Sequence, residues 1–169
     1  MKKVSVLVVF SVTALLIGCY NDISFDLIPY IEFRDLRKET TLDSFSGSKK
    51  DSVIISIHFE DGDGDLGLSE EEKKVAVDKQ DFNYLLKIFR SKDGVFQEIP
   101  QPVPYSGFFP RLKLDDKKRP IEGTLNYSIV YFHNSVPAKD TVKYQITIKD
   151  RAGNVSNTVE SKPIILREF

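Results

Sequence analysis

The feature that most constrains this fold is the strict alternation of apolar and polar side chains in short runs. In the clearest run, residues 141–149, one face carries Val142, Tyr144, Ile146 and Ile148, and the other carries Lys143, Gln145, Thr147 and Lys149. Successive side chains of a β-strand point to opposite faces, so this pattern is typical of an antiparallel strand with one buried and one solvated face. We therefore expect Tyr144 to lie in the core.

Less regular runs of the same kind recur along most of the chain. We predict strands over residues 30–42, 53–59, 82–90, 95–99, 123–132, 141–149 and 155–166. Turn residues separate them, as at Lys92-Asp93-Gly94, and only one helical turn is expected. About seven short strands with so little helix predict an all-β fold, an antiparallel β-sandwich.

The N-terminus has the pattern of an export signal. Lys2 and Lys3 precede an apolar run from Val4 to Ile17, which is a basic segment followed by a hydrophobic one. The run is too short to cross a bilayer, since a transmembrane helix needs roughly 20 apolar residues. We therefore expect this segment to be removed by processing.

The end of this segment, Leu16-Ile17-Gly18-Cys19, resembles the lipobox of bacterial lipoproteins. The resemblance implies a signal peptide over residues 1–18, an acylated Cys19, a tether over residues 19–29 and one domain over residues 30–169. The alternative is an ordinary secretory signal with an incidental buried cysteine. An aspartate after the cysteine often retains such lipoproteins in the inner membrane. Because Tyr20 stands there instead, we predict a lipid-anchored protein of the outer membrane, and both a periplasmic and a surface-exposed domain fit.

Composition narrows the partners of the mature chain. Cys19 is the only cysteine, so its acylation leaves no thiol for a disulfide, a redox motif or a nucleophile. Without Lys2 and Lys3, 22 of the 24 lysines and arginines remain against 25 acidic residues. This weakly acidic chain has no basic patch that would indicate nucleic-acid binding. We expect contact with the membrane through the lipid, and with an envelope protein or a glycan.

The C-terminal third carries a second resemblance. Residues 142–159, including Tyr144, Asp150, Gly153-Asn154 and Ser156-Asn157, look like the last hairpin of immunoglobulin-like and fibronectin type III-like domains of bacterial surface proteins. The mature chain, with its acidic segment 59–67 and its turn 150–154, is similar to uncharacterised lipoproteins of the Bacteroidota. The resemblance implies an immunoglobulin-like sandwich and an envelope location, and it implies no activity.

An acidic, glycine-rich loop after the second predicted strand is a candidate metal site. Asp61, Asp63 and Asp65 alternate with glycines, so the loop can turn tightly and bring three carboxylates together, which suits calcium. In an immunoglobulin-like sandwich the loop that contains Asp150 and Asn154 lies at the same end, so we expect these two residues to add oxygen ligands. The alternative is a solvated acidic turn without a metal.

An EF-hand is a poor description of this loop. Counted from Asp61, the position that requires glycine is Leu66, and a strand rather than a helix precedes the loop. Glu72 falls at the last ligand position, but Ser69 three residues earlier makes the pair resemble a capping box that would start a short helix.

A proline-rich stretch carries the other candidate site. Four prolines bracket Tyr105, Phe108 and Phe109, which predicts an edge or a loop because proline lacks a backbone donor. If the three aromatic side chains are exposed together, they form a ligand-binding surface. The alternative is that Phe108 and Phe109 cover one open end of the core.

These patterns favour a non-enzymatic envelope lipoprotein that serves as a binding or scaffolding module, for example as an accessory subunit of an outer-membrane assembly. The first alternative is a surface protein that binds carbohydrate through Tyr105, Phe108 and Phe109, although the chain has no tryptophan. The second alternative is a hydrolase. Neither His58 nor His133 has a spaced nucleophile or a second histidine beside it, so no catalytic residue is assigned.

Overall fold

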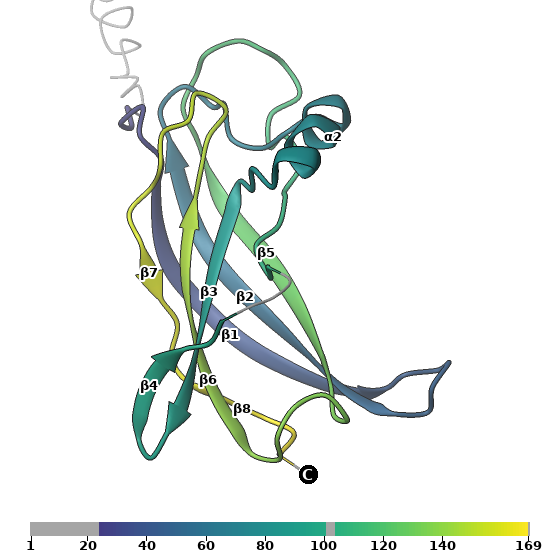
Figure 1. Ribbon diagram of the computed structural model, residues 1–169. Coiled ribbons are helices and arrows are strands. Elements are labelled where there is room, and N and C mark those ends of the chain that lie inside the picture. The colour runs from purple at the N-terminus through teal and green to yellow at the C-terminus, as the bar shows by residue number, and fades with distance from the viewer. Residues whose placement is uncertain (1–23, 101–103, 169) are drawn as a thin grey trace, which may run out of the picture.

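Two antiparallel β-sheets packed face to face make up the body of the protein, as Figure 1 shows for the computed structural model. The structure describes residues 24–100 and 104–168. The predicted signal peptide, Cys19 and the first residues of the predicted tether lie outside these residues. The paired sheets confirm the predicted antiparallel sandwich.

The first sheet has three strands in the order β1-β2-β5. These are β1 (Tyr30–Leu42), β2 (Lys49–Asp61) and β5 (Ile121–Phe132). A bulge between Phe33 and Asp35 shifts the phase of β1, which keeps both Phe33 and the later Leu36 on the inner face despite their odd spacing. The long central strand β2 is paired along almost its whole length on both edges.

The second sheet has the order β4-β3-β6-β7, with β8 also paired to β6. Its strands are β3 (Tyr84–Lys92), β4 (Val95–Glu98), β6 (Asp140–Ile148), β7 (Val159–Glu160) and β8 (Ile164–Leu166). The first, second and fifth strands thus share one sheet, and the third, fourth and sixth share the other. This arrangement needs connections that cross between the sheets, as in immunoglobulin-like sandwiches.

The last strand is not the continuous element that we predicted over residues 155–166, because it consists of the short strands β7 and β8. Two serine hydroxyls interrupt the ladder beside β6. Ser156 Oγ accepts a hydrogen bond from the backbone N–H of Ile148, and Ser161 Oγ accepts one from that of Tyr144, both at 3.0 Å. Pro163, which has no N–H, separates β7 from β8.

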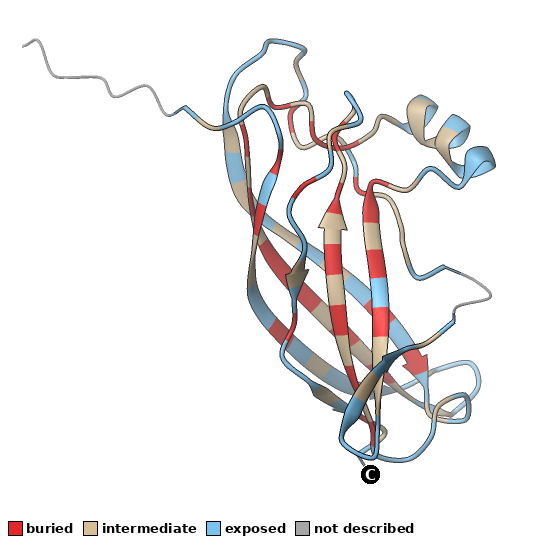
Figure 2. Cartoon of the chain, turned by 60° about the vertical axis from the view of Figure 1, so that its left-hand side comes forward, coloured by how far each residue is buried: buried red, intermediate tan, exposed pale blue. Residues whose placement is uncertain are grey.

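The core lies between the sheets and follows the alternation seen in the sequence (Figure 2). Tyr144 is fully buried, which confirms the predicted phase of β6. The inner face of β2 is buried from end to end, and that of β5 only near its C-terminal end. The largest fully buried side chains are Tyr84, Tyr144, Ile31, Ile55, Ile57, Leu66, Ile88, Ile146, Ile148 and Leu166.

The described residues include one helix, α2 (Glu70–Lys79), which projects from the loop between β2 and β3. Ser69 and Glu72 form the predicted capping box, and the helix extends well beyond the single turn that we expected. None of its residues is buried. In the described part of the chain, no helix has the length and apolar character needed to span a bilayer.

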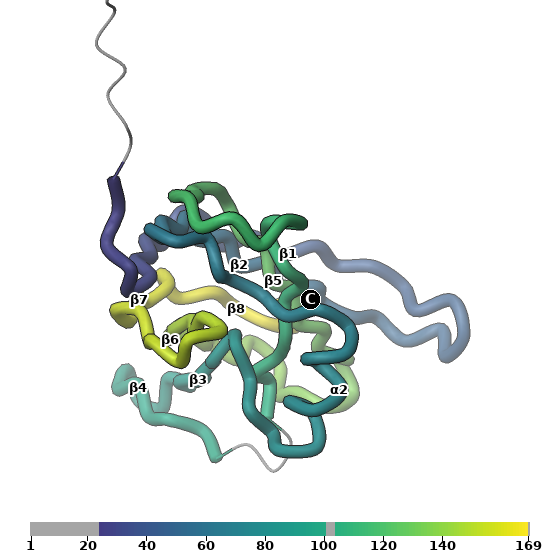
Figure 3. Tube along the Cα trace, turned by 90° about the horizontal axis from the view of Figure 1, so that it is seen from above, coloured from purple at the N-terminus to yellow at the C-terminus, as the bar shows by residue number. Residues whose placement is uncertain are grey.

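The two ends of the sandwich are built from different loops. The end at which the N-terminal segment enters β1 also carries the loops that follow β2 and β6 and the loop that precedes β5, as Figure 3 shows from above. Residues 24–29 have no regular secondary structure there. The opposite end carries the β1–β2 and β3–β4 hairpins, the β5–β6 loop and the C-terminus.

Candidate functional site

The two central strands, β2 and β6, continue into aspartates at the end of the sandwich where the N-terminal segment enters. Asp61 is the last residue of β2 and follows the inner-face residues Ile57 and Phe59 at the same spacing of two. Asp150 stands two residues after Ile148 of β6. Because side chains of alternate residues share a face, both carboxylates point inward, and both are buried, at 0 % and 4 % exposure.

A third carboxylate, that of Asp65, joins these two from the acidic loop. One carboxylate oxygen from each of Asp61, Asp65 and Asp150 lies within 4.8 Å of the other two. The loops that we expected to cluster are in direct contact, since the backbone N–H of Ala152 donates to Asp65 Oδ2 at 3.0 Å. We call Asp61, Asp65 and Asp150 the aspartate cluster.

Local hydrogen bonds fix each carboxylate of the aspartate cluster. Asp61 Oδ2 accepts from the backbone N–H of Asp65 at 2.9 Å, which closes the acidic loop. Both oxygens of Asp150 accept hydrogen bonds from Asn154, one from its backbone at 2.7 Å and one from its side-chain amide at 2.8 Å. The remaining oxygens, Asp61 Oδ1 and Asp65 Oδ1, are buried without a hydrogen-bond partner.

The backbone after Asp65 anchors the loop to the core. Leu66 is fully buried, and its carbonyl accepts a hydrogen bond from the N–H of Leu112 at 3.2 Å. Gly67 has a φ of +87°, and a β-carbon there would overlap the carbonyl oxygen of Pro110. Only glycine satisfies both demands, so Gly67 lets the loop pack closely against the segment around Pro110.

The electrostatic state of the aspartate cluster reflects burial of like charges. Burial, and then the charge of Asp65, raises the pKa of Asp61 to about 6. Burial, and then the charge of Asp150, likewise raises the pKa of Asp65. Within the described residues, no lysine, arginine or histidine forms an ion pair with any of the three. The group is therefore a concentrated negative charge without an ion-pair partner, and the charge of the nearby Arg151 only partly offsets the rise in the pKa of Asp65.

Two of the five predicted metal ligands, Asp63 and Asn154, lie outside the aspartate cluster. Asp63 Oδ2 pairs with Lys118 Nζ at 3.1 Å, and Asn154 directs its amide N–H at Asp150. Glu72 stands at the last ligand position of an EF-hand loop counted from Asp61. Its Oε1 lies 2.7 Å from Arg111 Nη2, and its side chain also completes the capping box of α2. No sequence signal separates Asp61 from Asp63, because both have the same strand phase as Asp65. They differ because β2 ends at Asp61 and because Lys118 pairs with Asp63.

The opposite end of the sandwich also has two buried aspartates, and each has a basic partner. Asp51 Oδ1 lies 2.9 Å from His133 Nε2, and Asp140 Oδ1 lies 2.8 Å from Arg90 Nε. His133, which carries no role in the sequence analysis, thus contacts a fully buried carboxylate. Arg167 of the C-terminal segment donates its backbone N–H to Asp51 Oδ2 at 2.7 Å.

A hollow of about 410 Å³ opens beside the ion pair of Arg90 and Asp140. It lies where β3 and β5 end and β6 begins, away from the aspartate cluster. Its walls are mainly apolar and aromatic, with the polar groups of the ion pair at one side. The apolar and aromatic side chains in its lining include Ile88, Ile99, Tyr105, Tyr131, Val136 and Val142.

The three predicted ligand-binding aromatics do not form one exposed surface, so this prediction needs correction. Phe109 is 4 % exposed and belongs to the core. Phe108 is half-buried and packs on Phe82, with ring centroids 5.2 Å apart. Tyr105 is 39 % exposed and lies at the hollow, with its ring 5.8 Å from that of Tyr131. Phe109 therefore closes the core, as the alternative interpretation held, and only Tyr105 lines a recess.

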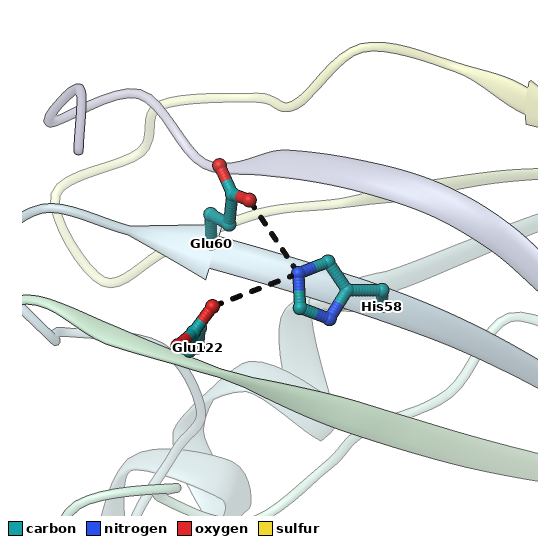
Figure 4. Close-up of side chains that lie close together, drawn as sticks. All are labelled: His58, Glu60 and Glu122. Atoms are coloured by element: carbon teal, nitrogen blue, oxygen red, sulfur yellow. Dashed lines mark ion pairs between the residues drawn. The ribbon is translucent and has the colours of Figure 1, made fainter.

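The outer face of the first sheet carries a separate group, His58 with Glu60 and Glu122 (Figure 4). His58 Nε2 lies 3.5 Å from Glu60 Oε1 and 4.0 Å from Glu122 Oε2. The two glutamates stand directly opposite each other on β2 and β5. Like charges at such positions repel, and the imidazole between them relieves the repulsion when it is protonated.

Comparison with known proteins adds no assignment to these sites. No protein-family model matches the chain, and no curated protein and no solved structure matches it significantly.

Proposed function

We propose that this protein is a lipid-anchored, non-enzymatic binding module of the bacterial cell envelope, and that its partner is another envelope protein. The observation that carries the proposal is the hollow of about 410 Å³ at the end of the sandwich opposite the N-terminal segment. Ligand sites in proteins are recesses of roughly this size, with mainly apolar walls and a few polar groups. An anchor at Cys19 would place the hollow at the end of the domain farther from the membrane.

The lining favours a protein segment over a glycan. Aliphatic side chains such as Ile88, Val136 and Val142 form much of the wall, and these suit an inserted apolar side chain of a partner. Carbohydrate sites need exposed aromatic rings, and of the three predicted aromatics only Tyr105 is exposed at the hollow, because Phe109 is buried and Phe108 packs on Phe82. The ion pair of Arg90 and Asp140 at the wall supplies a charged group that can orient the bound segment.

The hollow can be tested with a photoreactive amino acid at Ser135, which is exposed and lines the hollow. The matched control is the same amino acid at Glu122, on the outer face of β5. In the native host we expect a discrete protein adduct from position 135 and none from position 122. Val136→Arg should remove the adduct by filling the hollow, and its thermal midpoint shows whether the fold is retained. Equal adducts at both positions, or none at either, would contradict the proposal.

The anchor needs its own test, because it rests on the sequence alone. Labelling with a palmitate analogue should mark the wild-type protein and leave Cys19→Ala unmarked, and fractionation should place the label in the outer membrane. Full labelling of Cys19→Ala would show that the lipobox assignment is wrong. Protease treatment of intact cells then distinguishes a surface-exposed domain from a periplasmic one.

A further inference from the structure

The most unusual feature of the described residues is the difference between the two ends of the β2 and β6 inner faces. Each face begins with a buried aspartate, Asp51 on β2 and Asp140 on β6, and each continues into another, Asp61 and Asp150. At one end, His133 and Arg90 lie within 3 Å of the carboxylates. At the other end, Asp65 brings a third negative charge instead of a basic residue.

Buried carboxylates that lack a partner are costly, and this cost points to a missing cation. Asp61 is 0 % exposed and its Oδ1 has no hydrogen-bond partner. This oxygen belongs to a carboxylate in the cluster, so an unsatisfied acceptor is buried among like charges. Asp65 Oδ1 is in the same state, and so is Asp63 Oδ1 in the same loop, although the other oxygen of Asp63 pairs with Lys118. A cation between the carboxylates of the cluster would satisfy the oxygens of Asp61 and Asp65 and neutralise the repulsion.

We propose that Asp61, Asp65 and Asp150 bind one calcium ion at the end of the sandwich where the N-terminal segment enters. All the ligands offered are oxygens, which suits a hard cation and disfavours zinc, which prefers nitrogen and sulfur. The nearby lysines are committed elsewhere, because Lys113 donates to the carbonyl of Asp63 at 3.2 Å and Lys118 pairs with its carboxylate.

The coordination demand of calcium fits this set. Calcium takes six to eight oxygens at flexible geometry, and aspartate binds it through one or both oxygens. Each carboxylate has about four lone-pair sites, so Asp150 can bind a cation while it still accepts the hydrogen bonds of Asn154. Three carboxylates with water can complete such a shell, whereas magnesium demands near-ideal octahedral geometry and keeps most of its own water.

The proposed site also lies against the chain that leads to the predicted anchor. Gly62 follows Asp61 directly and donates its N–H to the carbonyl of Asp26 at 2.8 Å. A β-carbon on Gly62 would overlap the carbonyl oxygens of Phe25 and Asp26, so this contact requires glycine. A metal that orders the acidic loop therefore orders the surface on which the N-terminal segment is docked.

Thermal unfolding of the full chain tests the proposal, with millimolar calcium, millimolar magnesium or excess chelator. At a calcium concentration tenfold above Kd, the midpoint should rise by roughly 3–6 °C over that in chelator. Calorimetric titration of calcium into the protein should show one site, and magnesium should give a much smaller shift. Asp61→Asn should remove the response to calcium. In chelator it should be at least as stable as the wild type, because it keeps the side-chain volume and removes a buried charge.

The matched control is Glu60→Gln, which neutralises the neighbouring carboxylate on the opposite face of β2 beside His58. It should respond to calcium like the wild type. Loss of the response in Glu60→Gln together with its retention in Asp61→Asn would move the ion to the group around His58 and overturn the assignment. Identical wild-type midpoints in calcium and chelator, without binding heat, would overturn the site itself. An equal shift with magnesium would overturn its selectivity for calcium.

Discussion

Replacing Asp51 with asparagine should destabilise the fold far more than its modest change in size suggests. The carboxylate is fully buried and accepts three hydrogen bonds. Thr40 Oγ1 and His133 Nε2 approach Oδ1 at 2.7 and 2.9 Å, and the N–H of Arg167 approaches Oδ2 at 2.7 Å. Asp51 thus joins the first sheet to the β5–β6 loop and to the C-terminal segment.

The expected cost follows from these contacts. Hydrogen bonds to a charged group are worth about 1.5–3 kcal/mol each, and their loss is not additive, so we expect Asp51→Asn to cost about 3–5 kcal/mol. Asp35→Asn is the control, because Asp35 is half-exposed and its pair with Lys162 spans 3.7 Å, which predicts a cost below about 0.5 kcal/mol. Urea titrations at pH 7 in chelator measure both. Equal costs for the two variants would refute the assignment of Asp51 as a structural link.

The pH dependence of the same variant provides a second measurement. Burial pushes the pKa of Asp51 upward, but hydrogen bonds from His133, the Arg167 backbone and Thr40 outweigh it, and the net pKa is lower than its ordinary 3.8. A carboxyl whose pKa is lower in the folded state stabilises the fold above its unfolded pKa, and this contribution is lost as the pH falls through the folded value. The contribution of the Asp51 carboxylate to this deficit should therefore be present at pH 5 and shrink as the pH falls below 3.8.

Two further substitutions test the core and the acidic loop. Tyr144→Ala should lower the free energy of unfolding by about 3–5 kcal/mol, because it removes a fully buried ring. Gln145→Ala, on the opposite face of β6, should lower it by less than about 1 kcal/mol. Similar urea midpoints for the two variants would show that the phase of β6 is wrong. Gly67→Ala should cost at least about 2 kcal/mol from its positive φ and the overlap with the neighbouring chain. Gly94→Ala, at a φ of +83° in open space, should cost only about 1 kcal/mol, and a difference near zero between these two would contradict the close packing at Gly67.

Much of the fold could be predicted because the core is encoded locally. Alternation places Tyr144, Ile146 and Ile148 on one face of β6 without any knowledge of the partner strands, and β1 begins and ends where the sequence predicts. The last strand could not be predicted in the same way. Its break depends on hydroxyls of Ser156 and Ser161 that bond the backbone of β6, and such competition between side chain and backbone is decided only when the strands meet.

The candidate metal site was only partly predictable for a similar reason. The spacing of Asp61, Asp63 and Asp65 identifies an acidic loop, and the expected strand order correctly brings Asp150 to it. The spacing of the three aspartates in the sequence does not show which of them forms an ion pair with a lysine. Lys118 neutralises Asp63 from a loop far along the chain, and that loop has no periodic pattern that would place it.

The prediction of one exposed surface formed by the three aromatic residues was wrong, because residue types alone do not show which side chains are buried. Tyr105, Phe108 and Phe109 are close in sequence, yet they face a hollow, a neighbouring ring and the core, respectively. The chain there makes only isolated bridges to its neighbours, at Gly107 and Pro110, so no strand period constrains the side-chain directions. An irregular segment can turn consecutive side chains to unrelated environments, and only tertiary contacts decide which of them is buried.

The distribution of buried aspartates along β2 and β6 predicts that one end of the sandwich becomes fully stable only after the expected export, where calcium is abundant. Calcium sites of extracellular modules have dissociation constants of about 10⁻⁴–10⁻³ M, so a site of that class fills only where calcium is millimolar. Before export, the repulsion between Asp61, Asp65 and Asp150 would weaken the end of the sandwich next to the N-terminal segment. In the envelope, calcium would remove this repulsion and stabilise the loop on which Asp26 docks. The opposite end needs no such step, since Asp51 and Asp140 have partners within the chain. The proposed ligand hollow therefore belongs to the part of the fold whose stability does not depend on calcium.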